Sequence, residues 1–184
     1  MPPIPPAPSR VLDIGCGAGQ RLIAGCADRV SFGIDLDETA LKLGTRLTKQ
    51  VRFTQGFAEA LPFENDVFDM VIARVSLPYT LLPESLPEIQ RVLKPSGFLW
   101  SVLHPFRLTW KQVRDAGYKR KLLFAYILAN SLLFHGLQKQ FVFAGRCESF
   151  QTRRGIRKAL EHCGLKDVHI ELHGKQFLVT ARKP

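Results

Sequence analysis

Short apolar runs, rich in β-branched residues, alternate along the chain with longer stretches in which apolar residues recur at helical spacing. The short runs predict five strands: Arg10–Ile14, Val30–Asp35, Val51–Thr54, Phe68–Ala73 and Gly97–Leu103. Strands that alternate with helices form a mostly parallel sheet covered on both faces, and ligands bind such sheets at the carboxyl ends of the strands. We therefore expect the functional residues in the loops that follow the strands.

Capping residues mark where two of the intervening helices begin. Asp37 has the side chain of an N-cap and predicts a helix over Glu38–Leu47. Ser85 and Glu88 have the spacing of a capping box, which predicts the start of a second helix at this point. The segment Lys94–Gly97 contains proline and glycine and is expected to end that helix.

The end of the chain has a different pattern. Ile156, Ala159, Leu160 and Cys163 share one face of a predicted helix, and Gly164 is expected to stop it. Two alternating runs follow, Val168–Leu172 and Phe177–Ala181. The few residues between them are too few for a parallel crossover, so these two strands are predicted to be antiparallel neighbours.

Residues 107–140 interrupt the alternation of strands and helices. The segment is basic at its start and apolar over Leu122–Phe134, which is too short a run to cross a bilayer. We expect one or two helices inserted after the fifth strand, with the apolar part forming a cap or wall over the substrate. The whole chain, 1–184, is predicted to be one domain preceded by a proline-rich segment, 1–9.

Charge is distributed unevenly along the chain. The net charge is +10, and residues 105–184 carry 16 of the 26 lysines and arginines but only 5 of the 16 acidic residues. This asymmetry raises the prospect of a nucleic acid or an anionic membrane surface as partner, although a merely solvated basic face explains it equally well. The basic run 119–121 with the apolar helix after it is the candidate for peripheral membrane contact.

Two further patterns bear on location and on metals. The first nine residues lack the basic and apolar regions of a secretory signal, so a cytoplasmic protein is expected. The four cysteines form no C-x-x-C pair, so we expect buried, reduced thiols and no metal site.

A glycine-rich turn follows the first predicted strand. Its sequence, VLDIGCGAG over residues 11–19, places glycines where the backbone approaches a ligand closely and a helix N-terminus offers free N–H groups. Gln20 stands where the dinucleotide fingerprint requires its third glycine, which makes a pyrophosphate ligand the weaker interpretation. Asp13 suits a cofactor with an ammonium group, such as S-adenosyl-L-methionine. Asp35, at the end of the second strand, is placed to accept hydrogen bonds from ribose hydroxyls.

The motifs VLDIGCGAG, GIDLD, GFAEALPFENDVFDMVIA and RVLKPSGFL, in this order, resemble the class I S-adenosylmethionine-dependent methyltransferases. Within that family the chain is similar to the branch that contains ubiquinone-biosynthesis and other small-molecule enzymes. The resemblance implies a Rossmann-like, seven-stranded, mostly parallel sheet with an antiparallel last strand. It also implies a methyltransferase that acts on a small-molecule acceptor.

The resemblance assigns a role to each matching residue. It places Asp13, Gly15, Cys16 and Gly17 around the methionine part of the cofactor, Asp35 on the ribose, Leu36 and the loop Phe57, Ala58 and Glu59 around the adenine, and Arg74 beside the methyl donor. Phe57 replaces an aspartate common in the family, so stacking or backbone contacts are expected instead of the usual hydrogen bond. Family members also commonly have helices before the first strand, where this chain has nine residues, so either residues 107–140 or a partner covers the site, or the chain is a shortened form.

Transfer of a methyl group from a sulfonium requires mainly positioning, and a base is needed only if the acceptor must lose a proton. His104, after the fifth strand, and Tyr79, after the fourth, are the candidate catalytic residues. A structural hydrogen bond for His104 and a place in the pocket wall for Tyr79 are the alternatives. Two other functions stay open: an RNA methyltransferase that uses the basic half of the chain, and a non-catalytic scaffold.

Overall fold

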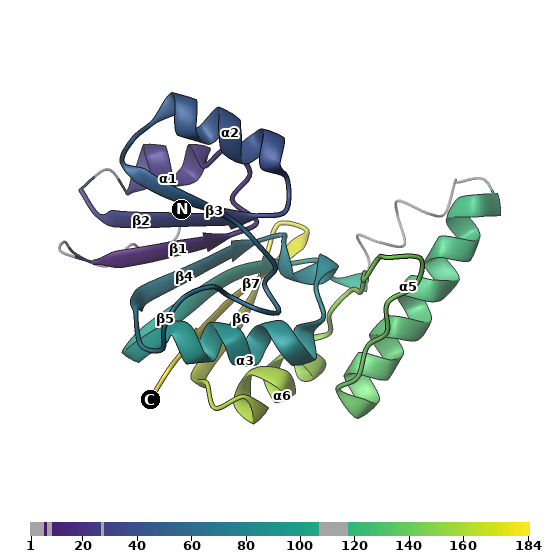
Figure 1. Ribbon diagram of the computed structural model, residues 1–184. Coiled ribbons are helices and arrows are strands. Elements are labelled where there is room, and N and C mark those ends of the chain that lie inside the picture. The colour runs from purple at the N-terminus through teal and green to yellow at the C-terminus, as the bar shows by residue number, and fades with distance from the viewer. Residues whose placement is uncertain (1–5, 7–8, 27, 107–117) are drawn as a thin grey trace.

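Seven strands form one sheet in a computed structural model that describes residues 6, 9–26, 28–106 and 118–184 (Figure 1). The strands are β1 (Arg10–Ile14), β2 (Val30–Asp35), β3 (Val51–Gln55), β4 (Phe68–Arg74), β5 (Leu93–Leu103), β6 (Lys166–His173) and β7 (Gln176–Arg182). Their order is β3-β2-β1-β4-β5-β7-β6. All neighbours pair in parallel except at β7, which is antiparallel to both β5 and β6. The predicted Rossmann-like sheet with its reversed last strand is confirmed.

Helices cover the two faces of the sheet unequally. The helical elements are α1 (Gln20–Gly25), α2 (Glu38–Leu47), η1 (Leu77–Tyr79), α3 (Leu82–Val92), α5 (Tyr118–Leu137) and α6 (Arg153–His162). Figure 1 shows α1 and α2 on one face, α3 and α6 on the other, and α5 standing away from the sheet beside the loop that follows it. None of the helices in the described ranges is long and apolar enough to cross a membrane.

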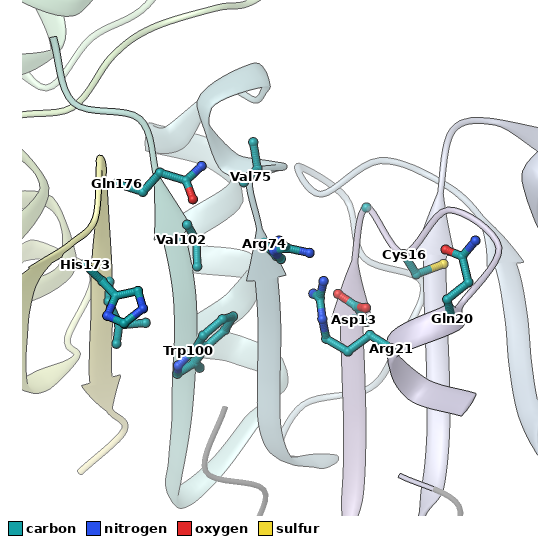
Figure 2. Close-up of a pocket in the computed structure, with 12 residues that line it drawn as sticks. Asp13, Cys16, Gln20, Arg21, Arg74, Val75, Trp100, Val102, His173 and Gln176 are labelled. Carbon is teal, nitrogen blue, oxygen red and sulfur yellow. The ribbon is translucent and has the colours of Figure 1, made fainter. Parts of the chain in front are cut away.

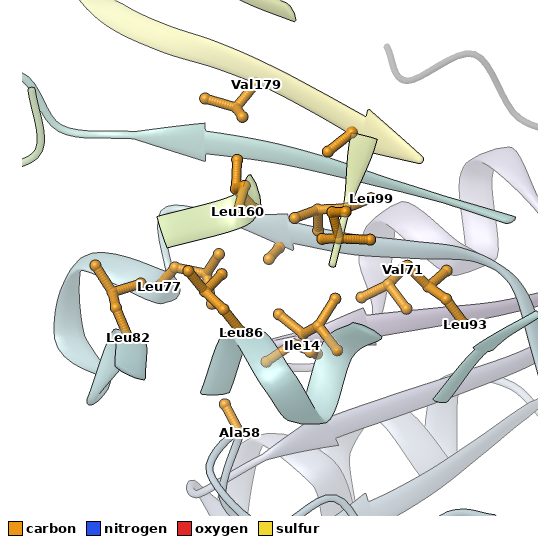
Figure 3. Close-up of a cluster of buried hydrophobic side chains, with 14 of the residues drawn as sticks. Ile14, Ala58, Val71, Leu77, Leu82, Leu86, Leu93, Leu99, Leu160 and Val179 are labelled. Carbon is orange, nitrogen blue, oxygen red and sulfur yellow. The ribbon is translucent and has the colours of Figure 1, made fainter. Parts of the chain in front are cut away.

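The larger of two buried apolar clusters lies between the sheet and the helices α3 and α6 (Figure 3). Strand residues such as Val71 and Leu99 meet Leu86 of α3 and Leu160 of α6 there, and all four are essentially inaccessible to water. A smaller cluster on the opposite face joins α1 to β1, β4 and β5 through Leu22, among others. Burial on both faces explains why the parallel strands are continuous apolar runs rather than alternating ones.

The two predicted helix starts have different outcomes. Asp37 caps α2 as expected, because its carboxylate accepts hydrogen bonds from the backbone N–H groups of Thr39 and Ala40. The prediction that a capping box at Ser85 and Glu88 starts the second helix is wrong, since α3 begins three residues before Ser85, at Leu82.

Groups from outside α3 take over the role of a local cap. Pro83 stands in the first turn, where its fixed φ favours a helix and its missing N–H costs nothing. The N–H groups of Leu81 and Leu82 donate to the side chains of Glu59 and Gln140, at 2.8 and 2.7 Å. Because residues distant in sequence satisfy these N–H groups, the helix start has no local capping side chain, and Pro83 is its local signal.

Strand β5 begins at Leu93 rather than at the predicted Gly97. Leu93 pairs with Phe68, and the register then shifts before Phe98 pairs with Met70. The segment Lys94–Gly97 does end α3, but it does so as an irregular stretch within the strand, with Ser96 in the left-handed region (φ 65°).

Phe53 of β3 fills a slot made by three glycines. A Cβ atom would lie 2.6 Å from the Phe53 ring at Gly19 and at Gly44, and 3.2 Å from it at Gly33. Gly19 precedes α1, Gly33 belongs to β2 and Gly44 to α2. One ring therefore packs the start of α1, the second strand and α2 together, and only glycine leaves room for it.

A Gly44→Ala substitution should lower the stability of the protein, although alanine normally stabilises a helix by about 1 kcal/mol over glycine. The new Cβ would meet the Phe53 ring and, at 2.9 Å, the carbonyl oxygen of Ala18, and overpacking of this kind typically costs about 1–3 kcal/mol. Gly136→Ala in α5 is the matched control, because its Cβ meets no atom within 4 Å. Denaturant unfolding should show the two changes with opposite signs, and equal effects would contradict the tight slot.

Candidate functional site

Two cavities open at the carboxyl ends of the parallel strands, with Gly15 in the wall of both. The first, which we call the Asp13 cavity, has a volume of about 780 Å³. It is lined by Asp13, Gly15, Cys16, Gln20, Arg21, Arg74, Val75, Trp100, Val102, His173, Gln176 and Leu178 (Figure 2). The second, the Asp35 cavity, has a volume of about 490 Å³. Its wall includes Asp35, Leu36, Phe57, Ala58, Glu59, Ser76, Tyr79, Val142, Gly145 and Cys147.

Asp13, next to the last residue of β1, is only 2% exposed, and one of its carboxylate oxygens, Oδ1, has no hydrogen-bond partner among the described residues. Burial is the main reason that the pKa of Asp13 rises from 3.8 to about 7. Asp35 raises it further, while Arg21 and Arg74 oppose the shift. Figure 2 shows both guanidinium groups directed toward the carboxylate. A buried, unsatisfied carboxyl at the wall of a cavity is a position at which a cationic ligand would be stabilised.

The glycine turn after β1 takes a shape that side chains rarely allow. Gly15, Gly17 and Gly19 all have positive φ, at 71°, 55° and 73°. At Gly17 a Cβ would meet no atom within 4 Å, so the backbone faces open space there. Asp35 fixes the turn, because its Oδ2 accepts a hydrogen bond of 2.7 Å from the N–H of Gly17 and its Oδ1 one of 3.0 Å from Asp37. A carboxylate has about four acceptor positions, so two lone pairs of Asp35 stay available to a ligand.

Cys16 lies in the same turn and has a packing role. Its thiol donates to the carbonyl of Gly17 at 3.3 Å and lies 2.7 Å from the position that a Cβ of Gly33 would take. Burial, with help from the charges of Asp13 and Asp35, raises its pKa far above the usual thiol range. The four cysteines are free, but the prediction that they are buried holds only for Cys16 and Cys26, because Cys147 and Cys163 are partly exposed.

An apolar rim surrounds the Asp35 cavity. Leu36 and Phe57 are 55% and 62% exposed, which is high for large apolar side chains, whereas the neighbouring Ala58 is buried. Glu59 also lines this cavity, and its Oε1 holds the N–H of Leu81 at the start of α3. The structure thus gathers the predicted adenine-contacting residues around one cavity, and it gives Glu59 a structural contact that the sequence did not indicate.

The backbone after β4 is strained at the edge of both cavities. Val75 has φ 64°, a left-handed conformation that is strongly disfavoured for a β-branched residue. This turn brings Ser76 against Gly15, and its hydroxyl donates a 2.7 Å hydrogen bond to the carbonyl of Ile14. Arg74, the last residue of β4, lies in the wall of the Asp13 cavity. Strain of this kind persists where the surroundings enforce it and is concentrated at ligand sites.

His104 and Tyr79, which come from different segments, meet in the structure. Their rings pack edge to face with centroids 6.1 Å apart. Burial lowers the pKa of His104, while burial and the charge of Glu148 raise the pKa of Tyr79. Tyr79 lines the Asp35 cavity, whereas His104 is not among the lining residues of either cavity and contacts this site through the Tyr79 ring.

Part of the wall of the Asp35 cavity comes from residues just beyond the segment expected to cover the site, 107–140, and none of the described residues of that segment is among its lining residues. Val142, Gly145 and Cys147, in the loop after α5, line the Asp35 cavity. The apolar helix residues Leu122–Phe134 are not among its described lining residues, so the expected wall comes from the loop and not from the helix. The first part of the predicted insertion, 107–117, lies outside the described residues.

Sequence reasoning missed several lining residues. Arg21 stands in the first turn of α1, one residue after Gln20, and a cation so near a buried Asp13 is a signal that was available in the sequence. The sequence contains no such signal for Trp100, Gln176 or the loop residue Val142, because only the folded sheet and the path of the loop bring them to the site. Over the ranges that the structure describes, no group of three or more His, Cys, Asp or Glu side chains is arranged to hold a metal ion.

Comparisons with known proteins agree with this geometry. Residues 11–97 match the family model of a methyltransferase domain. The chain is 30% identical to a demethylmenaquinone methyltransferase of Lactococcus lactis, in an alignment that covers 95% of this chain and 74% of that protein. It is 31% identical to the uncharacterized methyltransferase YcgJ of Bacillus subtilis, over 72% of this chain and 60% of that one. A match of 35% identity to a phthiotriol/phenolphthiotriol dimycocerosates methyltransferase of Mycobacterium leprae covers 49% of this chain and 36% of that protein.

Solved structures share the fold at low sequence identity. An S-adenosylmethionine-dependent methyltransferase from Mesorhizobium loti superposes with a TM-score of 0.71 at 17% identity, covering 98% of this chain and 94% of that one. A second, from Methanosarcina mazei, gives 0.67 at 19% identity and covers 97% and 94%. With the glycine turn, the acidic residues at the ends of β1 and β2 and the seven-stranded sheet, these findings show that the chain belongs to the class I S-adenosylmethionine-dependent methyltransferases, whose cofactor is S-adenosylmethionine.

Proposed function

We propose that this chain transfers the methyl group of S-adenosylmethionine to a small-molecule acceptor at the strand ends of β1, β2 and β4. The observation that carries the proposal is the buried carboxyl of Asp13, whose Oδ1 lacks a partner among the described residues and which lies beside an open glycine turn. Relatives named for demethylmenaquinone and for phthiotriol dimycocerosates support a small-molecule acceptor.

The residues present fit the cofactor. The free oxygen of Asp13 suits the ammonium of the methionine part, and the open backbone at Gly17 leaves room for a ligand to approach. The remaining acceptor positions of Asp35 suit the two ribose hydroxyls. Exposed Leu36 and Phe57 offer apolar surface to the adenine, with stacking on Phe57 in place of the family's usual hydrogen bond.

Bound at these residues, S-adenosylmethionine supplies an activated methyl group on a sulfonium. The protein's own contribution is then mainly to hold donor and acceptor in line and to exclude water, which accounts for a large part of the acceleration in such transfers. We assign these tasks to Arg74 beside the donor and to Tyr79 and Val142 in the wall of the Asp35 cavity.

His104 is the candidate base for acceptors that must lose a proton. Its lowered pKa keeps the imidazole neutral at pH 7 and therefore able to accept a proton. Tyr79, with its raised pKa, stays protonated, and it lines the Asp35 cavity with its ring packed against that of His104.

An Asp35→Ala substitution should weaken binding of S-adenosylhomocysteine by about 10- to 100-fold, because charge-assisted hydrogen bonds typically contribute about 1.5–3 kcal/mol. Asp28→Ala, an exposed carboxylate at the other end of β2, is the matched control and should bind normally. Calorimetric titration measures both. Since Asp35 also holds Gly17, circular dichroism should accompany the titration, and unchanged affinity in a folded Asp35→Ala variant would contradict the ribose role.

Cofactor affinity should rise by about tenfold between pH 6 and pH 8, because an ammonium pairs only with the ionised form of Asp13. With a pKa of about 7, Asp13 is mostly protonated at pH 6 and mostly ionised at pH 8. In the free protein the stability of the fold changes with pH in the opposite direction to the cofactor affinity. The raised pKa of Asp13 stabilises the fold below pH 3.8, and this stabilisation is lost as the pH rises through 7. Asp13→Asn should abolish the pH dependence of binding, and a flat profile in the unsubstituted protein would rule out the ammonium contact.

Transfer itself can be followed with S-adenosylmethionine labelled in its methyl group, offered with demethylmenaquinone or with RNA. We expect label in the organic phase, and a His104→Gln variant should turn over at least tenfold more slowly with unchanged cofactor affinity. Label in the RNA would favour the alternative based on the basic half of the chain. Cofactor binding without transfer to either acceptor class would favour the scaffold alternative.

A further inference from the structure

A tight turn in the loop after α5 holds three large apolar side chains out in water. Phe141, Val142 and Phe143 are 41%, 52% and 63% exposed. The N–H and carbonyl of Phe143 bond those of Arg146 at 2.9 and 3.0 Å, and Ala144 and Gly145 between them both have positive φ. This is the geometry of a two-residue hairpin turn, and we call residues 139–146 the apolar turn.

The exposure of these side chains is not a consequence of a loose loop. The Tyr126 hydroxyl of α5 lies 2.8 Å from the carbonyl oxygen of Arg146 and 3.1 Å from that of Phe141. The fully buried amide of Asn130 accepts from the N–H of Phe141 and donates to the carbonyl of Glu148. The Tyr126 ring also packs on the rings of Phe141 and Phe143, at 5.2 and 5.7 Å. α5 therefore fixes the turn in place with its apolar residues facing outward.

The outer side of α5 continues this apolar character. Exposed positions recur at a spacing of three and four residues, and they are Leu122, Ala125, Ala129, Leu132 and Gly136. No lysine, arginine or acidic residue occurs between Leu122 and Leu137. Exposed apolar residues that recur along one side of a helix mark an interaction site more often than scattered single residues do.

The charges on α5 and through the apolar turn are all of one sign, whereas acidic residues lie near this surface at the Asp35 cavity, where Glu59 and Glu84 share the wall with Val142, and at Glu148. Exposed Lys121, Lys139 and Arg146 flank the apolar surface, and the sequence contains no acidic residue from 116 to 147. A second copy of the chain would bring the same cations together whichever way two α5 helices paired. An anionic lipid surface instead offers hydrocarbon to the apolar residues and negative headgroups to the cations.

We propose that the apolar turn and the outer side of α5 dock the protein on the surface of an anionic lipid bilayer. The helix lies on the membrane and does not span it, since it does not have the length and hydropathy of a span. Val142 and Gly145 belong both to the turn and to the wall of the Asp35 cavity. The docked cavity would thus open beside the bilayer, and, resting on the proposed function, an apolar acceptor would reach the methyl donor from the lipid.

Sedimentation of the full chain with vesicles tests the docking without requiring any methyl transfer. We expect binding to an equal mixture of phosphatidylcholine and phosphatidylglycerol, weakening with salt, and little binding to phosphatidylcholine alone. Phe143→Ser should weaken binding by about tenfold, while Leu47→Ser, a similarly exposed leucine on α2, should not. Lys139→Glu should weaken it by roughly tenfold or more, and Lys158→Glu on α6 is the control of equal charge change.

Three results would overturn the proposal. The first is that the protein does not bind the mixed vesicles. The second is that Phe143→Ser binds as well as Leu47→Ser, and Lys139→Glu as well as Lys158→Glu. The third is that light scattering shows a dimer that Phe143→Ser dissociates. Calorimetric binding of S-adenosylhomocysteine to the same variants separates this question from the proposed function. A protein that binds cofactor but not vesicles disproves only the docking, and one that binds vesicles but not cofactor disproves only the methyl transfer.

Discussion

The close packing of Phe53 against glycine backbone is the constraint on which the cofactor site depends. The ring occupies space that a Cβ at Gly19, Gly33 or Gly44 would take, so it joins the start of α1, the second strand and α2 at van der Waals distance. This packing places Gly19, the last residue of the glycine turn, directly against the Phe53 ring of β3. Because Asp35 then reaches the N–H of Gly17, the two strand ends that carry the acidic residues share one rigid frame.

Electrostatics within that frame explain why a ligand is favoured. Asp13 is buried, and its Oδ1 has no hydrogen-bond partner among the described residues. Its pKa of about 7 reflects how unfavourable the ionised carboxylate is in that environment. Arg21 and Arg74 offset only part of the cost. A cationic group placed at Asp13 recovers it, so part of the binding free energy is stored in the free protein as an unfavourable buried carboxyl. The left-handed Val75 nearby is a second local cost located at the same site.

The loop after α5 forms another part of the site, in the wall of the Asp35 cavity, and hydrogen bonds from α5 hold it there. α5 contributes few polar groups, but two of them, Tyr126 and Asn130, determine the path of the loop that follows. The helix thereby connects the apolar turn to the Asp35 cavity, into whose wall Val142, Gly145 and Cys147 project. Figure 1 shows the consequence for the whole molecule, a helix held away from the sheet beside a loop that returns to the strand ends. This part of the protein lies outside the residues that match the family model, 11–97.

The sequence by itself determined the sheet, the order of its elements, the cap at Asp37 and the positions of Asp13 and Asp35, the acidic residues of the proposed cofactor site, at the ends of two strands. These features depend on local hydrophobic periodicity, on glycine conformation and on side chains within a few residues of the backbone they bond. Only the tertiary structure decided that α3 starts at Leu82, because Glu59 and Gln140 satisfy its first N–H groups from a distance. The same holds for the pairing of His104 with Tyr79 and for the loop wall of the Asp35 cavity. Such contacts join residues that are far apart in the chain, and no pattern along the sequence encodes the distance between them.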